Sequence, residues 1–309
     1  MKFKIGVDGG GTKTECVLVN QEGTVVAVHV GAGCNPSIVG PAQARSIVTA
    51  ALNSLRAQAA TNGGGATRAP FREAPEITAT LLCMAGSGGF WSEFAASLSG
   101  FGRIAALDDS LPVLELATHG QPGLVLHAGT GSFVAARAPD GSVHYAGGLG
   151  WRFGDPGSGY DLGRRAIARA LLEFQGWAPA SRLGLMVRAH AHFDDTVDAG
   201  AVTRYYYQHP EINHQIADLA PAILQLAGEG EPAAQQLVFK STAKLLDLAT
   251  QVAGKLFPAA LPGTVRTGLS GPILTHPVVM EALAARTPLP LAPVEGKPIE
   301  GVRRLLEKY

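Results

Sequence analysis

The chain has 309 residues, of which 46% are hydrophobic and 16% charged, and its 25 basic residues balance its 25 acidic residues. This length exceeds the size at which one core usually keeps growing, so two domains are expected. The neutral balance gives no general attraction to nucleic acid or membranes. Three cysteines without C-x-x-C spacing favour a reducing compartment. No signal peptide or transmembrane run is evident, so we expect a cytoplasmic protein without nucleic-acid or membrane partners.

The chain opens with the pattern of three antiparallel strands. Alternating apolar residues predict a strand over 2–7 that ends at Asp8. Three glycines follow and predict a turn, because glycine adopts positive φ at little cost. Short β-branched runs over 16–19 and 24–30 predict two further strands, which a hairpin turn at 21–23 connects.

The same order of elements returns in the second half of the chain. A strand over 123–127 runs into a glycine turn, a second strand covers 133–136, and a hairpin turn at 139–141 leads to a third strand. This repetition indicates a duplicated unit. The alternative is a chance similarity between two hairpins.

Helices and strands alternate in the rest of the chain, which predicts mixed α/β sheets. The expected elements are a helix over 42–60, a surface loop over 61–75, strands over 77–84, 104–107 and 264–269, and helices over 90–98, 112–118, 160–174, 216–228 and 232–256. We predict an N-terminal domain over 1–119 and a C-terminal domain over 120–309. The last residues, 297–309, are expected to form a helix that could pack back on the N-terminal domain. No motif is assigned to 178–213, where Tyr205–Tyr207 suggests a partner or domain surface.

The first glycine turn has the composition of a phosphate-binding hairpin. It is not a Walker A loop, which needs glycine directly before the lysine and a helix after it. It is not a dinucleotide fingerprint either, because a strand follows where a helix is needed. Its backbone N–H groups could approach a phosphate closely, and Asp8 could hold magnesium through water. A plain hairpin turn is the structural alternative, and Lys13 could equally be a solvated side chain.

The second glycine turn, Gly129-Thr130-Gly131-Ser132, offers the same backbone groups from the repeated unit. Each turn alone is a weak signal. Their equivalent places in the two units predict a pair of turns that hold the phosphates of one nucleotide.

Two further segments carry candidate chemistry. Asp108-Asp109 ends a strand and precedes a helix, where open α/β sheets place functional residues. One of these carboxylates could accept the proton of an attacking hydroxyl, while helix N-capping is the structural alternative. The segment 147–160 interleaves glycines with aromatic residues and one acid, Asp155, which indicates a loop shaped around a ligand. A purely structural loop is the alternative there.

These motifs, in this order, resemble the N-acetylglucosamine kinases. The resemblance rests on residues 8–13, Asn35-Pro36, Asp109-Ser110, 128–132, 147–160 and 269–272. It extends to glucosamine kinases, to the activating ATPases of 2-hydroxyacyl-CoA dehydratases and benzoyl-CoA reductases, and to the superfamily of sugar kinases, heat-shock chaperone ATPases and actin. It implies an α/β fold of two ribonuclease-H-like domains with a nucleotide cleft between them.

The resemblance also implies roles for single residues, with ATP and Mg²⁺ as cofactors. Asp109 would be the general base, and Asp8 would help to place the metal. The sugar would contact Asn35, Asp109, Gly148 and Asp155. The ATP-binding positions would be Gly9, Gly10, Gly11, Thr12, Lys13, Gly129, Thr130, Gly131, Ser132, Gly268, Ser270 and Gly271. Leu269-Ser270-Gly271-Pro272 departs from the two consecutive glycines that many relatives carry at this point.

The expected function is ATP-dependent phosphorylation of an amino sugar, with N-acetylglucosamine and its 6-phosphate favoured. Asn35 beside Pro36, and apolar residues around the single acid Asp155, suit an acetamido group better than a free ammonium group. A glucosamine kinase is one alternative. An activating ATPase is another, although it needs cysteine ligands for a shared iron–sulfur cluster and no cysteine here has suitable neighbours. A homodimer is left open.

Overall fold

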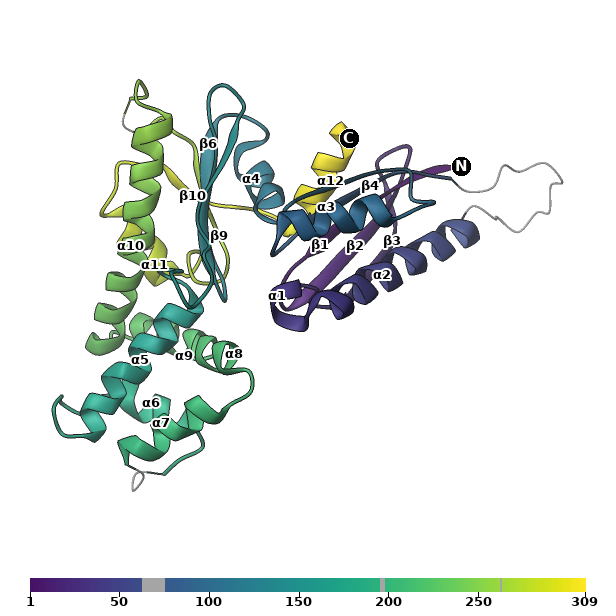
Figure 1. The fold of residues 1–309 in the computed structure, drawn as a ribbon. Helices are drawn as coiled ribbons and strands as arrows, with labels where there is room; N and C mark the ends of the chain where they lie inside the picture. Colours follow the sequence, from purple (N-terminus) through teal and green to yellow (C-terminus); the bar gives the residue numbers. More distant parts are fainter. Residues whose placement is uncertain (63–75, 195–197, 262) are drawn as a thin grey trace. The chain divides into compact units, whose positions relative to one another are not determined.

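The computed structural model describes residues 1–62, 76–194, 198–261 and 263–309 (Figure 1). Residues 63–75 of the predicted surface loop therefore lie outside the described ranges. The chain divides into two compact units, and each is built on its own five-stranded sheet. Unit 1 comprises Met1–His119 and Glu295–Tyr309, and unit 2 comprises Gly120–Val294. Across these described ranges, no helix combines the length and apolar character needed to cross a membrane.

The sheet of unit 1 is mixed, with the strand order β3-β2-β1-β4-β5. The first three strands form an antiparallel meander, whereas β4 runs parallel to both β1 and β5. The carboxyl ends of β1, β4 and β5 therefore meet at one edge of the sheet, where Asp8 and Asp108 lie. The strands are β1 (Lys2–Gly9), β2 (Lys13–Asn20), β3 (Val25–Ala32), β4 (Glu76–Met84) and β5 (Arg103–Asp108).

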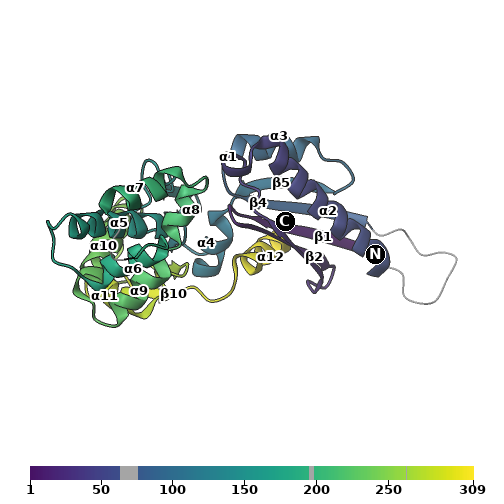
Figure 2. The same ribbon diagram turned by 90° about the horizontal axis from the view of Figure 1, so that it is seen from below.

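Helices cover both faces of this sheet, which explains why β1, β2 and β4 carry runs of buried apolar residues (Figure 2). On one face, α2 and α3 contribute Leu52 and Trp91 to a core with Ile5 of β1. On the other face, Val302 and Leu306 of α12 pack against the sheet. The helices are α1 (Pro36–Val39), α2 (Pro41–Asn62), α3 (Gly88–Ser97), α4 (Ser110–Thr118) and α12 (Pro298–Lys308).

The sheet of unit 2 repeats the plan of unit 1, with the strand order β10-β9-β6-β7-β8. Again a three-stranded antiparallel meander comes first, and the fourth strand pairs parallel with the first and the fifth. The predicted duplication is thereby confirmed, and with it the fold class. The strands are β6 (Gly123–Ala128), β7 (Ser132–Arg137), β8 (Val143–Gly147), β9 (Thr267–Ser270) and β10 (Leu291–Pro293).

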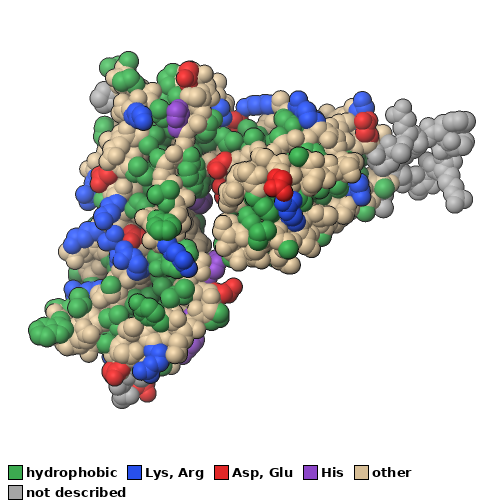
Figure 3. Space-filling view, viewed as in Figure 1, with side chains coloured by type: hydrophobic (Ala, Val, Ile, Leu, Met, Phe, Trp, Pro, Cys, Tyr) green, Lys and Arg blue, Asp and Glu red, His purple; other side chains and the backbone are tan. Residues whose placement is uncertain are grey.

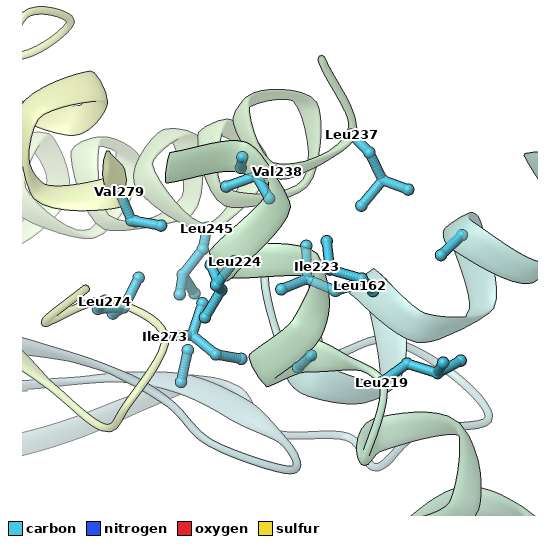
Figure 4. Close-up of a cluster of buried hydrophobic side chains, with 14 of the residues drawn as sticks. Leu162, Leu219, Ile223, Leu224, Leu237, Val238, Leu245, Ile273, Leu274 and Val279 are labelled. Carbon is cyan, nitrogen blue, oxygen red and sulfur yellow. The ribbon is translucent and has the colours of Figure 1, made fainter. Parts of the chain in front are cut away.

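Helices α5 and α10 carry much of the core of unit 2. Leu162 of α5, Ile223 of α9 and Leu245 of α10 lie in one buried apolar cluster (Figure 4). The helices of this unit are α5 (Gly159–Phe174), α6 (Arg182–His190), α7 (Ala199–Gln208), α8 (Ile212–Ala217), α9 (Ala220–Gly228), α10 (Pro232–Leu256) and α11 (Pro277–Ala284).

The structure adds elements that the sequence analysis did not predict, and it corrects one expectation. Residues 178–213, to which no motif is assigned, contain α6, α7 and the start of α8. The expectation that Tyr205–Tyr207 forms a surface is wrong for Tyr206, which is 3% exposed and belongs to the core, whereas Tyr207 is exposed. The strand β10 was not predicted, because three residues that include a proline show no strand pattern.

Candidate active site

The first glycine turn is held by the neighbouring strand ends of unit 1. The N–H group of Gly10 donates to the carbonyl of Lys13 at 2.9 Å, and the N–H group of Cys34 donates to the carbonyl of Gly10 at 3.0 Å. A Cβ atom at Gly9 would come within 2.4 Å of the end of the Met84 side chain and 2.8 Å of the Cys34 sulfur, so a larger residue would have to displace these buried side chains. The turn therefore packs against the end of β4 and is hydrogen-bonded to the segment after β3.

Two side chains of this turn have defined electrostatic surroundings. Burial raises the pKa of Asp8 to about 6, against the opposing effect of the Lys13 ammonium. Lys13 itself forms an ion pair with Glu15 at 2.7 Å. The lysine is thus engaged within its own hairpin, and Thr12 is exposed at the tip.

The two adjacent acids at the end of β5 do different things. Asp108 is exposed, and its Oδ1 atom accepts the N–H group of Ser110 at 2.9 Å, which ties it to the first residue of α4. Asp109 occupies the N-cap position of the same helix, but its side chain makes no capping hydrogen bond. Capping thus engages Asp108 and leaves the carboxylate of Asp109 available.

Burial is the main reason why the pKa of Asp109 rises to about 7, and the negative charges of Asp108 and Asp8 raise it further. Because the charge of Asp8 affects the pKa of Asp109, these two predicted site residues at the ends of β1 and β5 lie close enough to interact electrostatically. Near neutral pH the Asp109 carboxyl group can therefore both accept and release a proton. This property is what a general base requires.

Asn35 also lies near this edge of the unit 1 sheet. Its Oδ1 atom caps α1 by accepting the N–H group of Ser37 at 3.0 Å. A Cβ atom at Gly86, which follows β4, would lie 2.8 Å from the same oxygen. The capping bond fixes the Asn35 side chain beside the end of β4, where its amide NH₂ group can donate to a ligand.

In unit 2, the second glycine turn is bonded to the long glycine loop, residues 147–160. Gly159 donates its N–H group to the carbonyl of Gly129 at 2.8 Å, and the hydroxyl of Ser132 donates to the carbonyl of Pro156 at 2.8 Å. Gly148 donates its N–H group to the carbonyl of Ser132 at 3.1 Å. The two segments that sequence analysis assigned to phosphate and to sugar thus form one hydrogen-bonded assembly.

Asp155 is the acid of this assembly. A Cβ atom at Gly131 would lie 2.8 Å from its Oδ2 atom, so the glycine lets the carboxylate approach the turn. Its Oδ1 atom is buried and has no hydrogen-bond partner within the described residues. Burial raises the pKa of Asp155 to about 6, and the N–H groups of Gly150 and Ser132 act in the opposite direction. A buried acceptor without a partner can accept a hydrogen bond from a hydroxyl group of a ligand.

The predicted adenosine contacts meet the same turn from β9. Gly271 has φ of +86°, and a Cβ atom there would lie 2.3 Å from the carbonyl oxygen of Ala128. The Ser270 hydroxyl lies 3.2 Å from Nδ1 of His127. Burial lowers the pKa of His127 to about 4, so this imidazole is neutral at physiological pH. Gly268 lies within β9 itself and is buried.

Sequence analysis missed a polar network behind the glycine loop. The Asp161 carboxylate accepts hydrogen bonds from Arg164, Arg165 and the Ser241 hydroxyl. Ser241 in turn accepts the N–H group of Gly157 at 3.1 Å. The pattern Ser158-x-x-Asp161 is a capping signal at the start of α5 and could have drawn attention to the acid. No local signal connects it with Ser241, which lies 80 residues further along the chain.

Neither cofactor conflicts with the residues present. No group of three His, Cys, Asp or Glu side chains in the described ranges forms a ready metal site. Magnesium, however, commonly keeps several waters and takes one or two carboxylates together with nucleotide phosphates. Asp8 at a glycine turn with accessible backbone groups suits that mode of binding. The predicted site residues thus form two groups, one in each unit.

Two duplicated α/β units of this kind form the fold of sugar kinases. A candidate N-acetylglucosamine kinase from Chromobacterium violaceum shares the fold, with a TM-score of 0.75, 28% identity and 99% coverage of both chains. The model of the BadF/BadG/BcrA/BcrD ATPase family matches residues 5–257. The chain therefore belongs to the BadF/BadG/BcrA/BcrD ATPase family.

Two relatives that are named as sugar kinases are similar in sequence. The chain is 28% identical over 181 residues to an N-acetylmuramic acid/N-acetylglucosamine kinase from Clostridium acetobutylicum, across 56% of this chain and 55% of that protein. It is 27% identical over 247 residues to a glucosamine kinase from Vibrio cholerae, across 79% of this chain and 78% of that protein. The match thus spans about half of the first relative and more than three quarters of the second.

Proposed function

We propose that the protein is an ATP-dependent kinase that phosphorylates an amino sugar, with Asp109 as the general base. The observation that carries the proposal is the division of roles at the end of β5. Asp108 is hydrogen-bonded to the start of α4, whereas Asp109 is half-buried, makes no capping bond and has a pKa raised to about 7. Relatives that act on N-acetylglucosamine, N-acetylmuramic acid or glucosamine support the substrate class.

In this proposal, Asp109 accepts the proton of the sugar hydroxyl as its oxygen forms a bond to the γ-phosphorus. The bond from that phosphorus to the bridging oxygen breaks, and ADP leaves with the electron pair. Backbone N–H groups of the two glycine turns, residues 9–13 and 129–132, bind phosphate oxygens, and Asp8 would hold magnesium. Magnesium, when bound, supplies neutralisation of the phosphate charge.

The sugar is assigned to Asn35, Gly148, Asp155 and Asp109. The unpartnered Oδ1 atom of Asp155 suits a ring hydroxyl, and Asn35 offers its amide to an acyl oxygen. Leu149 and Phe153, which are 67% and 83% exposed on the glycine loop, offer apolar surface for an acetyl methyl group. We therefore propose N-acetylglucosamine as substrate and its 6-phosphate as product.

The decisive assay measures ADP release with ATP and magnesium against N-acetylglucosamine, glucosamine and glucose, with phosphorus NMR to locate the phosphate. The proposal expects the highest kcat/KM for N-acetylglucosamine. Efficient turnover of glucosamine alone would transfer the assignment to a glucosamine kinase, which the Vibrio cholerae relative also favours. ATP hydrolysis that no sugar stimulates would overturn the kinase assignment.

The family also contains activating ATPases, and the thiols of this chain argue against that role. An iron–sulfur cluster shared between subunits needs accessible thiolates. Cys16, Cys34 and Cys83 are fully buried in unit 1, and burial raises the pKa of each thiol. These cysteines are therefore poor ligands for a cluster at a subunit surface.

A further inference from the structure

Unit 2 carries a surface pocket of about 640 Å³ between α5 and α10, apart from every residue assigned to the reaction. Three arginines of α5 and one lysine of α10 line it, together with apolar side chains that include Leu172 and Leu237. No acidic residue is among its lining side chains. Figure 3 shows Lys and Arg side chains gathered over the region where these two helices meet. The cationic residues of the pocket are Arg164, Arg165, Arg169 and Lys240.

The acids near the pocket neutralise only part of this charge. Arg164 and Arg165 both pair with the single carboxylate of Asp161, at 2.9 and 2.8 Å. Arg169 pairs with Glu173 at 3.0 Å. Lys240 is exposed and has no ion-pair partner in the described part of the chain. The side chains that line the pocket thus include four cations and no acid, and the ion pairs given for these cations involve only two acids, Asp161 and Glu173.

The pocket combines this charge with apolar surface. Leu172 is 47% exposed at its wall, and the volume lies in the range of pockets that hold small molecules. Guanidinium groups bind phosphate through paired hydrogen bonds. We propose that this pocket binds a small anion of the phosphate monoester class that carries an apolar group, and that it is a regulatory site.

The regulatory role follows from the position of Asp161. The Oδ1 atom of this carboxylate is paired with Arg164, and its Oδ2 atom accepts both Arg165 and the hydroxyl of Ser241. Ser241 accepts the N–H group of Gly157, in the glycine loop that is bonded to the second phosphate turn. An anion that takes hydrogen bonds from Arg164 and Arg165 weakens their hold on Asp161. The glycine loop then loses part of its support.

The proposed regulation rests on the proposed function, because the proposed function assigns the glycine loop to sugar binding. Occupation of the pocket raises the KM for sugar and leaves kcat little changed, because Asp109 lies in the other unit and keeps its surroundings. By linkage, the sugar must weaken binding of the anion by the same factor.

Binding is tested by calorimetry on the full chain with three probes: hexyl phosphate, inorganic phosphate and 1-hexanol. Hexyl phosphate should bind more tightly than either of the others, and more weakly at high salt. Lys240→Gln should weaken its binding by about three- to fivefold, the upper part of the range for one exposed charge contact. Lys244→Gln, an exposed lysine of α10 outside the pocket lining, is the matched control and should change binding less than twofold.

Equal affinity for hexyl phosphate and inorganic phosphate, or equal effects of the two lysine variants, would overturn the site. This binding measurement needs no turnover, so it remains decisive even if the proposed kinase activity fails. With an active enzyme, saturating hexyl phosphate should raise the sugar KM severalfold in the parent protein and less in Lys240→Gln. Binding at the pocket without any change in KM would overturn the coupling through Asp161.

Discussion

Replacing Asp109 by asparagine should abolish turnover and, at the same time, make unit 1 more stable above pH 7. Asp109 is half-buried, and burial together with the negative charges of Asp108 and Asp8 raises the pKa of its carboxyl group from 3.8 to about 7. Asparagine keeps the shape of the side chain but can neither accept the proton nor carry the buried charge. Removal of the proposed base should lower kcat by about 10²- to 10⁴-fold, the usual contribution of general base catalysis.

The expected gain in stability follows from the same pKa. One pKa unit corresponds to about 1.4 kcal/mol, so a shift of about three units makes the ionised carboxylate cost up to about 4 kcal/mol in the folded state. Between pH 4 and pH 7 the folded protein retains a proton that the unfolded chain has released. The free energy of unfolding therefore falls as pH rises through this window and is constant above it. Because the asparagine amide must find partners of its own, we expect a gain of about 1–3 kcal/mol at pH 8 and almost none at pH 4.

The free energy of unfolding of unit 1 is measured in urea, with hydrogen exchange of the β1 and β4 amides as the probe of unfolding. The matched control is Asp108→Asn, which removes an exposed charge but can still accept the N–H group of Ser110. This control should retain most of the turnover and change stability little. The reasoning is refuted if Asp109→Asn has the same effect on stability at pH 4 and pH 8, or if it leaves turnover intact.

Three further results are expected. The kcat/KM of the parent enzyme should fall as pH drops below about 7, because Asp109 becomes protonated, and more steeply below about 6, where Asp8 also gains a proton; a flat profile between pH 5 and 8 would contradict both roles. Lys308→Met should destabilise unit 1 by about 1 kcal/mol, since it removes the half-exposed ammonium group that α12 places beside the buried carboxylate of Glu115; Lys297→Met, at the other end of α12, is its control, and equal unfolding curves would contradict the prediction. Gly131→Ala should lower kcat/KM at least tenfold with the fold retained, because a Cβ atom would lie 2.8 Å from a carboxylate oxygen of the glycine loop; unaltered kinetics would show that this approach is unimportant.

Local sequence patterns were sufficient for the fold class. The strand, glycine turn and hairpin over residues 2–30 recur over 123–147, and the two sheets share one strand order. Such patterns are readable because alternation of apolar residues and the backbone freedom of glycine act over only a few positions. The strand β10 escaped because its pairing with β9, and not its own composition, makes it a strand.

For the candidate site, the sequence determined which residue types follow each strand, and only the tertiary structure decided what each one does. Two adjacent aspartates look alike in a sequence, but the direction in which β5 enters α4 gives Asp108 the capping bond and gives Asp109 the burial that raises its pKa. Asp161 and Ser241 meet because α5 and α10 pack together in the core of unit 2. Burial and contacts between distant segments depend on how elements pack, and no short stretch of sequence carries that information.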